Sequence, residues 1–197
     1  MPGIDTTLAL QALAAFLIGS IPFAVLAMLG SGIDIRQVGS GNPGFNNVLR
    51  VSKPRAALTL MGDMGKGFVP ILLFYDAAAD PSYEGWLLGF AAVFGHCYSP
   101  FLGFNGGKGI ATSSGVMLGL YPKLALAGLV FFVLVRLLGS NKKWPEAGAI
   151  ASVATWVFFA SLTYYYETGV ATRNAILMTV FLAWRHKTNF QNLLRRA

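Results

Sequence analysis

Two short stretches of glycine, amide and basic residues carry the groups best suited to binding a phosphate. The first runs from Gly39 to Arg50, where Gly39, Gly41 and Gly44 let the backbone approach a ligand closely. This pattern favours a phosphate-binding loop, although an ordinary polar turn is also built from Gly, Asn and Pro. The side-chain donors for phosphate oxygens are Ser40, Asn42, Asn46, Asn47 and Arg50.

The second stretch, Gly103 to Thr112, places Gly-Gly-Lys-Gly directly before an apolar segment. Backbone N–H groups, the N-terminal dipole of the expected helix and the Lys108 ammonium together favour an anion site. Thr112 adds a hydroxyl from the first turn. The stretch is not a Walker loop, because Leu102 stands where the motif requires its first glycine and Lys108 is followed directly by Gly109 instead of Ser or Thr. The glycines of Gly39 to Gly44 have the G-x-G-x-x-G spacing of dinucleotide-binding loops. They follow an apolar segment instead of a strand, so this match to the dinucleotide motif is weak.

Two further clusters contain ionisable groups near or inside apolar segments. Asp63 and Lys66 stand three residues apart and share one helical face, which fits either a polar site or an internal ion pair. At the C-terminal end, Arg185 and Lys187 fit a membrane anchor, whereas His186 and Asn189 are candidate site residues.

Cys97 and its neighbour His96 do not form a nucleophile–base pair in this interpretation. Adjacent residues point apart on a helix, and a lone thiol in an apolar segment is usually a small packed residue. One cysteine also makes no intrachain disulfide. Two histidines and one cysteine without ligand spacing predict no metal and no cofactor.

The elements that position these groups are membrane helices. Of the 197 residues, 55% are hydrophobic and only 12% are charged, more apolar surface than a water-soluble core needs. The net charge of +7 fits anionic lipid or substrate better than nucleic acid, because the basic residues form no long polar face. A single all-α membrane domain over residues 1–197 is expected.

Apolar windows long enough to approach a bilayer crossing predict seven spans, the fourth of them short. No basic residue precedes the first span, so it is expected to remain as a membrane helix and not to act as a signal peptide. The predicted spans are Thr7–Gly30, Ala56–Tyr75, Trp86–Phe104, Ile110–Leu120, Lys123–Leu138, Ala147–Tyr165 and Val170–Trp184.

The distribution of basic residues predicts the orientation of these spans. With seven spans, 12 of the 15 basic residues fall on the side that contains the C-terminus, whereas Lys123 and Arg173 fall opposite and Lys66 lies within a span. The positive-inside rule therefore predicts an outside N-terminus, a cytoplasmic C-terminus and both glycine-rich loops on the cytoplasmic face.

Several segments in order along the chain resemble the acyl-phosphate:glycerol-3-phosphate acyltransferases, the PlsY family of bacterial inner-membrane enzymes. These segments are Ile18–Phe23, Asp34–Arg36, Gly39–Arg50, Gly103–Thr112 and His186–Leu194. The resemblance implies transfer of a fatty acyl group from acyl phosphate to the 1-hydroxyl of glycerol 3-phosphate, giving lysophosphatidic acid and phosphate. It also implies an inner-membrane location, with membrane lipid and the two substrates as partners and a monomer as the expected state.

Carried over by position, the resemblance assigns site roles in all three polar segments. The expected catalytic residues are Ser40, Arg50, Lys108, His186 and Asn189, and the expected substrate- or phosphate-binding residues are Gly41, Asn42, Asn47, Lys66, Gly107, Gly109 and Thr112. These segments are expected to meet in one anion pocket.

The chain departs from the family pattern at several positions, which leaves the acceptor open. The family usually has Ala-Thr at Phe45-Asn46, Lys at Asn105 and Arg-Glu at Lys187-Thr188. Its Arg-Tyr-Val-Ser-Leu-x-Ser stretch is reduced to Leu138-Gly-Ser140 with a displaced Arg136.

An acyl phosphate is already activated, so positioning and charge neutralisation suffice and direct attack by the acceptor hydroxyl is expected. The competing hypothesis is a membrane carrier for phosphorylated metabolites, since intramembrane charges and glycine-rich entrances also suit transport. The absence of an inverted repeat and the placement of the polar clusters on one face argue against a carrier.

Overall fold

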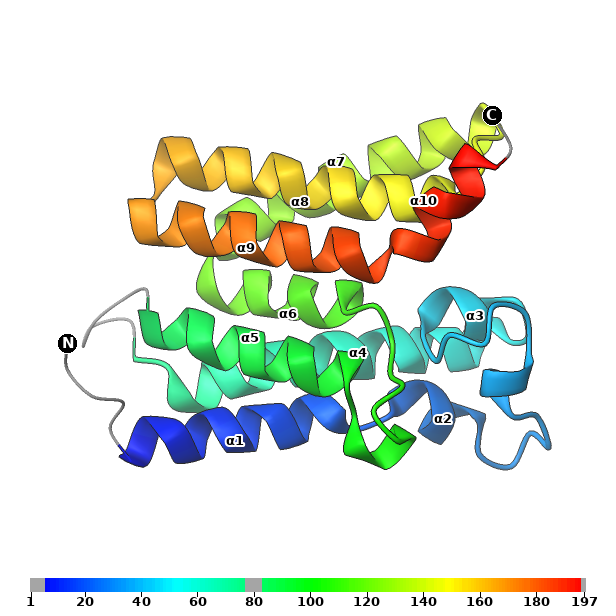
Figure 1. Cartoon of the computed structure of the whole chain (residues 1–197), viewed down its shortest axis with the longest axis horizontal. Coiled ribbons are helices and arrows are strands. Elements are labelled where there is room, and N and C mark those ends of the chain that lie inside the picture. Colours follow the sequence, from blue (N-terminus) through cyan, green and yellow to red (C-terminus); the bar gives the residue numbers. More distant parts are fainter. Residues whose placement is uncertain (1–5, 77–82, 196–197) are drawn as a thin grey trace. The chain divides into compact units, whose positions relative to one another are not determined.

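The structure is a computed structural model that describes residues 6–76 and 83–195 (Figure 1). These residues form helices and turns without a β-strand, which confirms the predicted all-α class. The helices are α1 (Thr6–Ser20), α2 (Phe23–Met28), η1 (Ile35–Gln37), α3 (Phe45–Leu49), α4 (Lys53–Phe74), α5 (Tyr83–Cys97), η2 (Pro100–Leu102), α6 (Ile110–Leu120), α7 (Pro122–Asn141), α8 (Ala147–Tyr166), α9 (Gly169–Arg185) and α10 (Lys187–Leu194).

The chain divides into two compact units, Met1–Leu120 and Tyr121–Ala197. The boundary falls where α6 ends and Pro122 begins α7, a position at which proline's missing N–H costs no helical hydrogen bond. The expectation of one membrane domain over residues 1–197 stays a prediction.

In the first unit, α1 packs on α5 and α4 packs on α6, with glycines at the closest points. A Cβ at Gly67 of α4 would overlap the carbonyl oxygen of Thr112 in α6, and a Cβ at Gly115 of α6 would overlap that of Met64 in α4. Backbone-to-backbone approach of this kind is typical of helices that pack inside a membrane. These contacts fix the position of α6, and of the loop before it, along the axis of α4.

In the second unit, α7, α8 and α9 follow one another as antiparallel neighbours (Figure 1). Trp156 and Phe159 of α8 are buried and contact each other edge-on, while Phe158 stacks on Phe131 of α7. The Thr179 hydroxyl of α9 donates to the Trp156 carbonyl at 3.2 Å. The unit ends in α10, which follows α9 after a single residue, His186.

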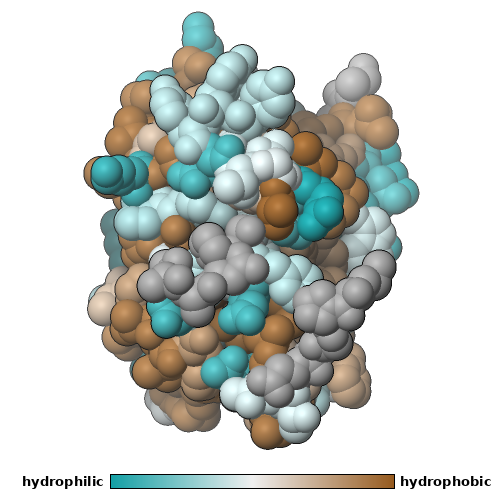
Figure 2. Space-filling view, turned by 90° about the vertical axis from the view of Figure 1, so that its left-hand side faces the viewer, coloured by the Kyte–Doolittle hydropathy of each residue, from teal (hydrophilic) through white to brown (hydrophobic). Residues whose placement is uncertain are grey.

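Four helical segments are long and apolar enough to cross a membrane: Thr6–Met28, Lys53–Phe74, Pro122–Asn141 and Ala147–Tyr166. α6 is apolar but has only 11 residues. Figure 2 looks onto the end where α8 meets α9, and hydrophilic residues are interspersed there with hydrophobic ones, while large hydrophobic side chains such as Leu72, Leu134 and Val180 are exposed along the helices. The chain is therefore an integral membrane protein by composition and surface, and the count of seven spans and the orientation of the termini stay predictions.

Two predicted spans are shorter or less regular than expected. The first is interrupted at Ile21-Pro22, where Pro22 has no N–H to continue α1, and α2 begins anew at Phe23. The third was expected to reach Phe104, but α5 ends at Cys97. Pro100 then begins η2, and Gly103 takes a left-handed conformation with φ +57°, so the chain turns away from the helix axis.

Candidate functional site

Both glycine-rich loops lie at the same end of the first unit (Figure 1). α1 and α5 end there, and α4 and α6 begin there, so the antiparallel packing of these helices delivers both loops to one face. That the two loops share the cytoplasmic side of the membrane stays a prediction.

Asn47 holds the first loop together from the inside. Its side chain is buried, and Nδ2 donates to the carbonyls of Ile35 at 3.0 Å and Val38 at 2.8 Å. Its Oδ1 accepts from the backbone N–H of Ser40 at 3.3 Å. These contacts shape the loop, and substrate binding by Asn47 stays a prediction.

The remaining polar groups of the first loop gather around the turn that Asn47 fixes. Gly39 and Gly41 have φ of +57° and +68°, which favour glycine. A Cβ at Gly39 would overlap both the Asn47 amide and the Arg50 guanidinium, so Arg50 folds back over the turn. Ser40 is exposed, and its hydroxyl accepts from the N–H of Asn42 at 3.4 Å. The loop thus presents Ser40, Asn42 and Arg50 together.

An ion pair on η1 precedes the loop. The Arg36 guanidinium donates to Asp34 at 2.8 and 2.9 Å. This hydrogen bond holds the pKa of the Asp34 carboxyl below its usual range. The contact is therefore complete above the ordinary carboxyl pKa and is lost as pH falls through the lowered one.

The second loop is anchored to the end of α5. The Gly106 N–H donates to the Cys97 carbonyl and the Gly107 N–H donates to the His96 carbonyl, each at 3.1 Å. These two amides were expected to face an anion, and the structure instead uses them to fasten the loop. Gly109, with φ +89°, then turns the chain into α6.

Two further groups that the sequence predicts to bind an anion lie at the start of α6. Lys108 is half-buried two residues before the first helical residue, and the first-turn N–H groups of any helix have no intrahelical acceptor. Thr112 is fully buried, and its Oγ1 has no hydrogen-bond partner among the described residues. A buried hydroxyl of this kind is expected to have a function or a missing partner.

Below the second loop, Asp63, Lys66 and His96 form a buried charged cluster. Asp63 Oδ1 lies 2.9 Å from Lys66 Nζ and 3.5 Å from His96 Nδ1. Lys66 also donates to the Ile21 carbonyl at 2.8 Å, next to the break between α1 and α2. A Cβ at Gly107 would overlap the His96 ring, so the cluster lies directly under the glycine loop.

This cluster bears on the expectations for Lys66 and Cys97 and adds His96 to them, while substrate binding by Lys66 stays a prediction. Lys66 was expected to bind substrate, but its side chain is only 3% exposed and is paired with Asp63, which favours the internal ion pair. Cys97 is buried as expected, whereas the role of His96 was missed. In the sequence, His96 stands ten residues before Gly106. This spacing does not predict its contact with Asp63 of another helix.

In the second unit, His186 and Asn189 occupy the junction of α9 and α10. His186 is buried, and its Nδ1 lies 2.8 Å from the Leu182 carbonyl. A carbonyl only accepts, so Nδ1 carries a proton and Nε2 is the basic nitrogen of the neutral ring. Asn189 Nδ2 donates to Glu146 Oε2 at 2.6 Å, a carboxylate that sequence reasoning did not single out.

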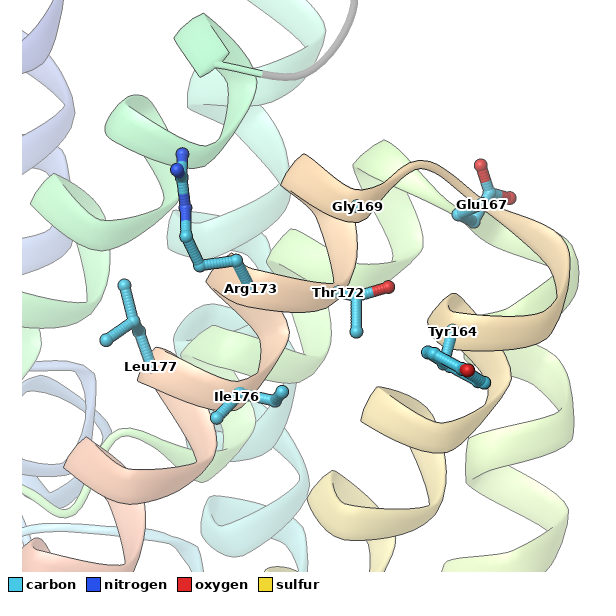
Figure 3. Close-up of a pocket in the computed structure, with 7 residues that line it drawn as sticks. All are labelled: Tyr164, Glu167, Gly169, Thr172, Arg173, Ile176 and Leu177. Carbon is cyan, nitrogen blue, oxygen red and sulfur yellow. The ribbon is translucent and has the colours of Figure 1, made fainter.

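A pocket at the opposite end of the second unit, of about 510 Å³, does not coincide with these groups (Figure 3). Figure 3 shows Arg173 and Glu167 extending from different sides of α9 and its preceding turn, so their charges do not converge. The pocket therefore lacks the converging polar groups of a catalytic site. Among residues 6–76 and 83–195, no three His, Cys, Asp or Glu side chains group closely enough to hold a metal ion.

Comparison with known proteins identifies the family. The family model described as glycerol-3-phosphate acyltransferase matches residues 9–196. The chain belongs to this family. A glycerol-3-phosphate acyltransferase of Azotobacter vinelandii is 38% identical over 186 residues, covering 93% of this chain and 94% of that protein. One from Laribacter hongkongensis is 41% identical over 194 residues, covering 96% of this chain and 93% of that protein.

The fold agrees with a solved member of the glycerol-3-phosphate acyltransferase family. The crystal structure of PlsY, an integral membrane glycerol 3-phosphate acyltransferase, in its glycerol 3-phosphate form matches with a TM-score of 0.86 and 30% identity. The match covers 95% of this chain and 92% of that chain. The same protein in its lysophosphatidic acid form matches with a TM-score of 0.84. The resemblance to PlsY drawn from the motifs is confirmed.

Proposed function

We propose that this membrane glycerol-3-phosphate acyltransferase takes its acyl group from acyl phosphate. The 1-hydroxyl of glycerol 3-phosphate attacks the acyl carbonyl carbon, the acyl–phosphate C–O bond breaks, and lysophosphatidic acid and inorganic phosphate are released. The observation that carries the proposal is the start of α6. Lys108, the helix N-terminus and the buried Thr112 hydroxyl offer a cation and donors matched to a leaving phosphate.

The other polar groups are assigned to the second substrate and to the proton. Arg50, with Ser40 and Asn42 beside it on the first loop, is suited to the phosphate of glycerol 3-phosphate, because a guanidinium forms paired hydrogen bonds with phosphate oxygens. His186 supplies Nε2 as the base for the hydroxyl proton. Gly41, Gly107 and Gly109 serve by shaping the two loops.

An apolar groove in the second unit is suited to the acyl chain. Its volume is about 560 Å³, and it runs along α7 and α8 to Phe190, the residue that follows Asn189. An acyl chain in the bilayer already lies in hydrocarbon, so the groove would align the chain by van der Waals packing against apolar side chains and not by removing it from water. The groove is lined by Phe131, Ile150, Val153, Ala154, Val157, Phe158, Ser161 and Phe190.

Transfer is proposed to be direct, in a bacterial inner membrane with the glycine loops on the cytoplasmic side. An acyl phosphate needs no activation by a protein nucleophile, since phosphate is already a good leaving group stabilised by Lys108. Direct transfer predicts that protein mixed with labelled acyl phosphate, without acceptor, retains no label after denaturation. Label that stays covalently bound at a single side chain would contradict this part of the proposal.

The main test is an assay of purified protein with acyl phosphate and glycerol 3-phosphate. Wild-type protein is expected to release phosphate and form lysophosphatidate in equal amounts. Lys108→Ala is expected to lower kcat/KM by about 10²-fold or more, as loss of one charge-stabilising group typically does. The matched control is Lys123→Ala, an exposed lysine in the first turn of α7, which should keep wild-type activity. Equal loss in both variants would remove Lys108 from the mechanism.

A further inference from the structure

Glu146 makes the contacts that carry a further inference within the second unit. Asn189 Nδ2 donates to its Oε2 at 2.6 Å, and Asn192 Nδ2 donates to its Oε1 at 3.4 Å. Asn189 and Asn192 stand three residues apart in α10, so they share one helical face. One carboxylate thus receives both amides of this face.

The Glu146 side chain makes these contacts with α10 and does not cap α8, although the Glu146 carbonyl accepts from the N–H groups of Ala149 and Ile150. Glu146 is the residue before α8, yet its side chain makes no capping hydrogen bond. Its φ of +55° is a left-handed conformation that a glutamate rarely adopts. Surrounding contacts must maintain this conformation, and the bonds to α10 are contacts of that kind.

The chemistry of the pair sets the orientation of Asn189. An ionised carboxylate only accepts hydrogen bonds, so the Asn189 NH₂ group must face Glu146. The amide is planar and rigid, so fixing its NH₂ group also fixes the direction of its oxygen. The segment from Lys187 to Leu194 contains no acidic residue of its own, so Glu146 supplies the carboxylate from another helix.

We propose that Glu146 is a positioning residue for acyl transfer, which acts by holding Asn189 with its amide oxygen directed to the acceptor hydroxyl. This inference rests on the proposed function, because it assumes that Asn189 contacts substrate. A negative carboxylate beside Asn189 disfavours a phosphate there. Asn189 therefore orients the acceptor hydroxyl, whereas the two glycine-rich loops bind the phosphates.

The experiment compares kcat and KM for glycerol 3-phosphate in wild type, Glu146→Gln and Glu146→Gly. The glutamine keeps the size but presents a donor to at least one of the two amides, so kcat should fall about tenfold or more with little change in KM. Glycine adopts φ +55° without strain, so Glu146→Gly should preserve the local backbone and still lose activity. Loss of activity in both variants assigns the effect to the carboxylate.

The matched control is Glu167→Gln, which removes the same charge at the other end of α8 from an exposed residue. It should keep wild-type kcat and KM. Wild-type kinetics in Glu146→Gln or Glu146→Gly would overturn the inference and leave the proposed function standing. A wild-type protein that forms no lysophosphatidate would instead overturn the proposed function, and the inference with it.

A double-mutant cycle shows whether Glu146 acts through Asn189. In the Asn189→Ala background, Glu146→Gln should cause no further loss, whereas independent roles would give multiplying losses. The thermal midpoint is also measured for the wild type, the two single variants and the double variant. It reports the coupling between Glu146 and Asn189 even if the activity of Asn189→Ala is too low to measure. Additive effects on both quantities would overturn the positioning role.

Discussion

Asn47 and Asn42 have the same side chain in the same loop, but the loop uses the side chain of Asn47 and the backbone N–H of Asn42. Asn47 is 2% exposed and bonds two carbonyls and one N–H of the loop, whereas the backbone N–H of Asn42 bonds the Ser40 hydroxyl. An amide supplies the same donors and acceptor to a loop as to a ligand. The residue type predicts a polar role, and only the path of the backbone decides which one.

Replacing Asn47 with alanine should therefore lower stability before it alters substrate binding. The carbonyls of Ile35 and Val38 would each lose one donor and keep a backbone N–H, and the Ser40 N–H would lose its acceptor, so the cost should be about 0.5–1.5 kcal/mol for each hydrogen bond lost. The thermal midpoint in detergent should fall, and activity should fall in proportion to the folded fraction. Asn46→Ala, at the exposed neighbouring position, is the control and should leave the midpoint unchanged. An unchanged midpoint for Asn47→Ala would contradict its structural role.

Asp63 and Lys66 form an ion pair whose contribution to stability depends on its burial. Removing one partner leaves the other charge buried without its partner, which typically costs about 3–5 kcal/mol. Asp63→Leu should therefore destabilise strongly, and the double variant Asp63→Leu/Lys66→Met should recover much of the loss. Thermal unfolding of the wild type, the single variant and the double variant measures this. A double variant less stable than Asp63→Leu would show that the ion pair is not the reason for the loss.

At the scale of helices, the contact between α4 and α6 depends on glycine at one position and not at another. Gly67 meets the Thr112 carbonyl, whereas nothing lies within 4 Å of a Cβ at Gly65, two residues earlier in α4. Gly67→Ala should push α6 away and cost about 1–3 kcal/mol, as overpacking typically does. Because Thr112 and Lys108 move with α6, acyl transfer should fall as well.

Gly65→Ala is the internal control for that prediction. Alanine has the higher helix propensity, so this variant should be neutral or more stable by up to about 1 kcal/mol. Thermal midpoints and acyl-transfer rates of the two variants are compared directly. Equal behaviour would mean that the close approach of α4 and α6 does not set the position of the second loop.

The helices themselves were largely predictable from the sequence, because long apolar windows separated by glycine, proline and charged residues leave few alternatives. The start of α6 at Ile110 was expected, whereas the short α3 within the first loop was not among the predicted segments. The end of α5 was not, because Cys97 to Phe104 is apolar enough to continue a span and only the turn at Pro100 and Gly103 ends it.

The site was predictable in its residue types but not in its partners. Lys108, Arg50 and Ser40 were predicted from local patterns, since glycine-rich backbone and side-chain donors suit an anion, although the same residue types also build an ordinary turn. His96 and Glu146 were missed because their roles come from contacts with residues 33 and 43 positions away, Asp63 and Asn189. No local periodicity records such contacts.

At the scale of the whole molecule, the proposed function requires that both glycine loops and the end of α9 face the compartment that supplies glycerol 3-phosphate. Seven spans meet this condition, because an odd number of crossings puts the first loop and the C-terminus on one side and the turn between α8 and α9 on the other. The excess of basic residues predicts that the loop side is cytoplasmic.

The single cysteine makes this arrangement directly testable. Replacing the buried Cys97 with alanine gives a protein without cysteine. A single new cysteine is then introduced at Asn46, Glu167 or Gln191, all of which are exposed. A membrane-impermeant maleimide added to the outer face of the inner membrane should label Glu167→Cys, and should label Asn46→Cys and Gln191→Cys only after the membrane is opened. Labelling of Gln191→Cys but not Asn46→Cys in the closed membrane would mean an even number of spans. His186 and Asn189 would then lie across the membrane from Lys108, and acyl transfer by these residues together would be impossible.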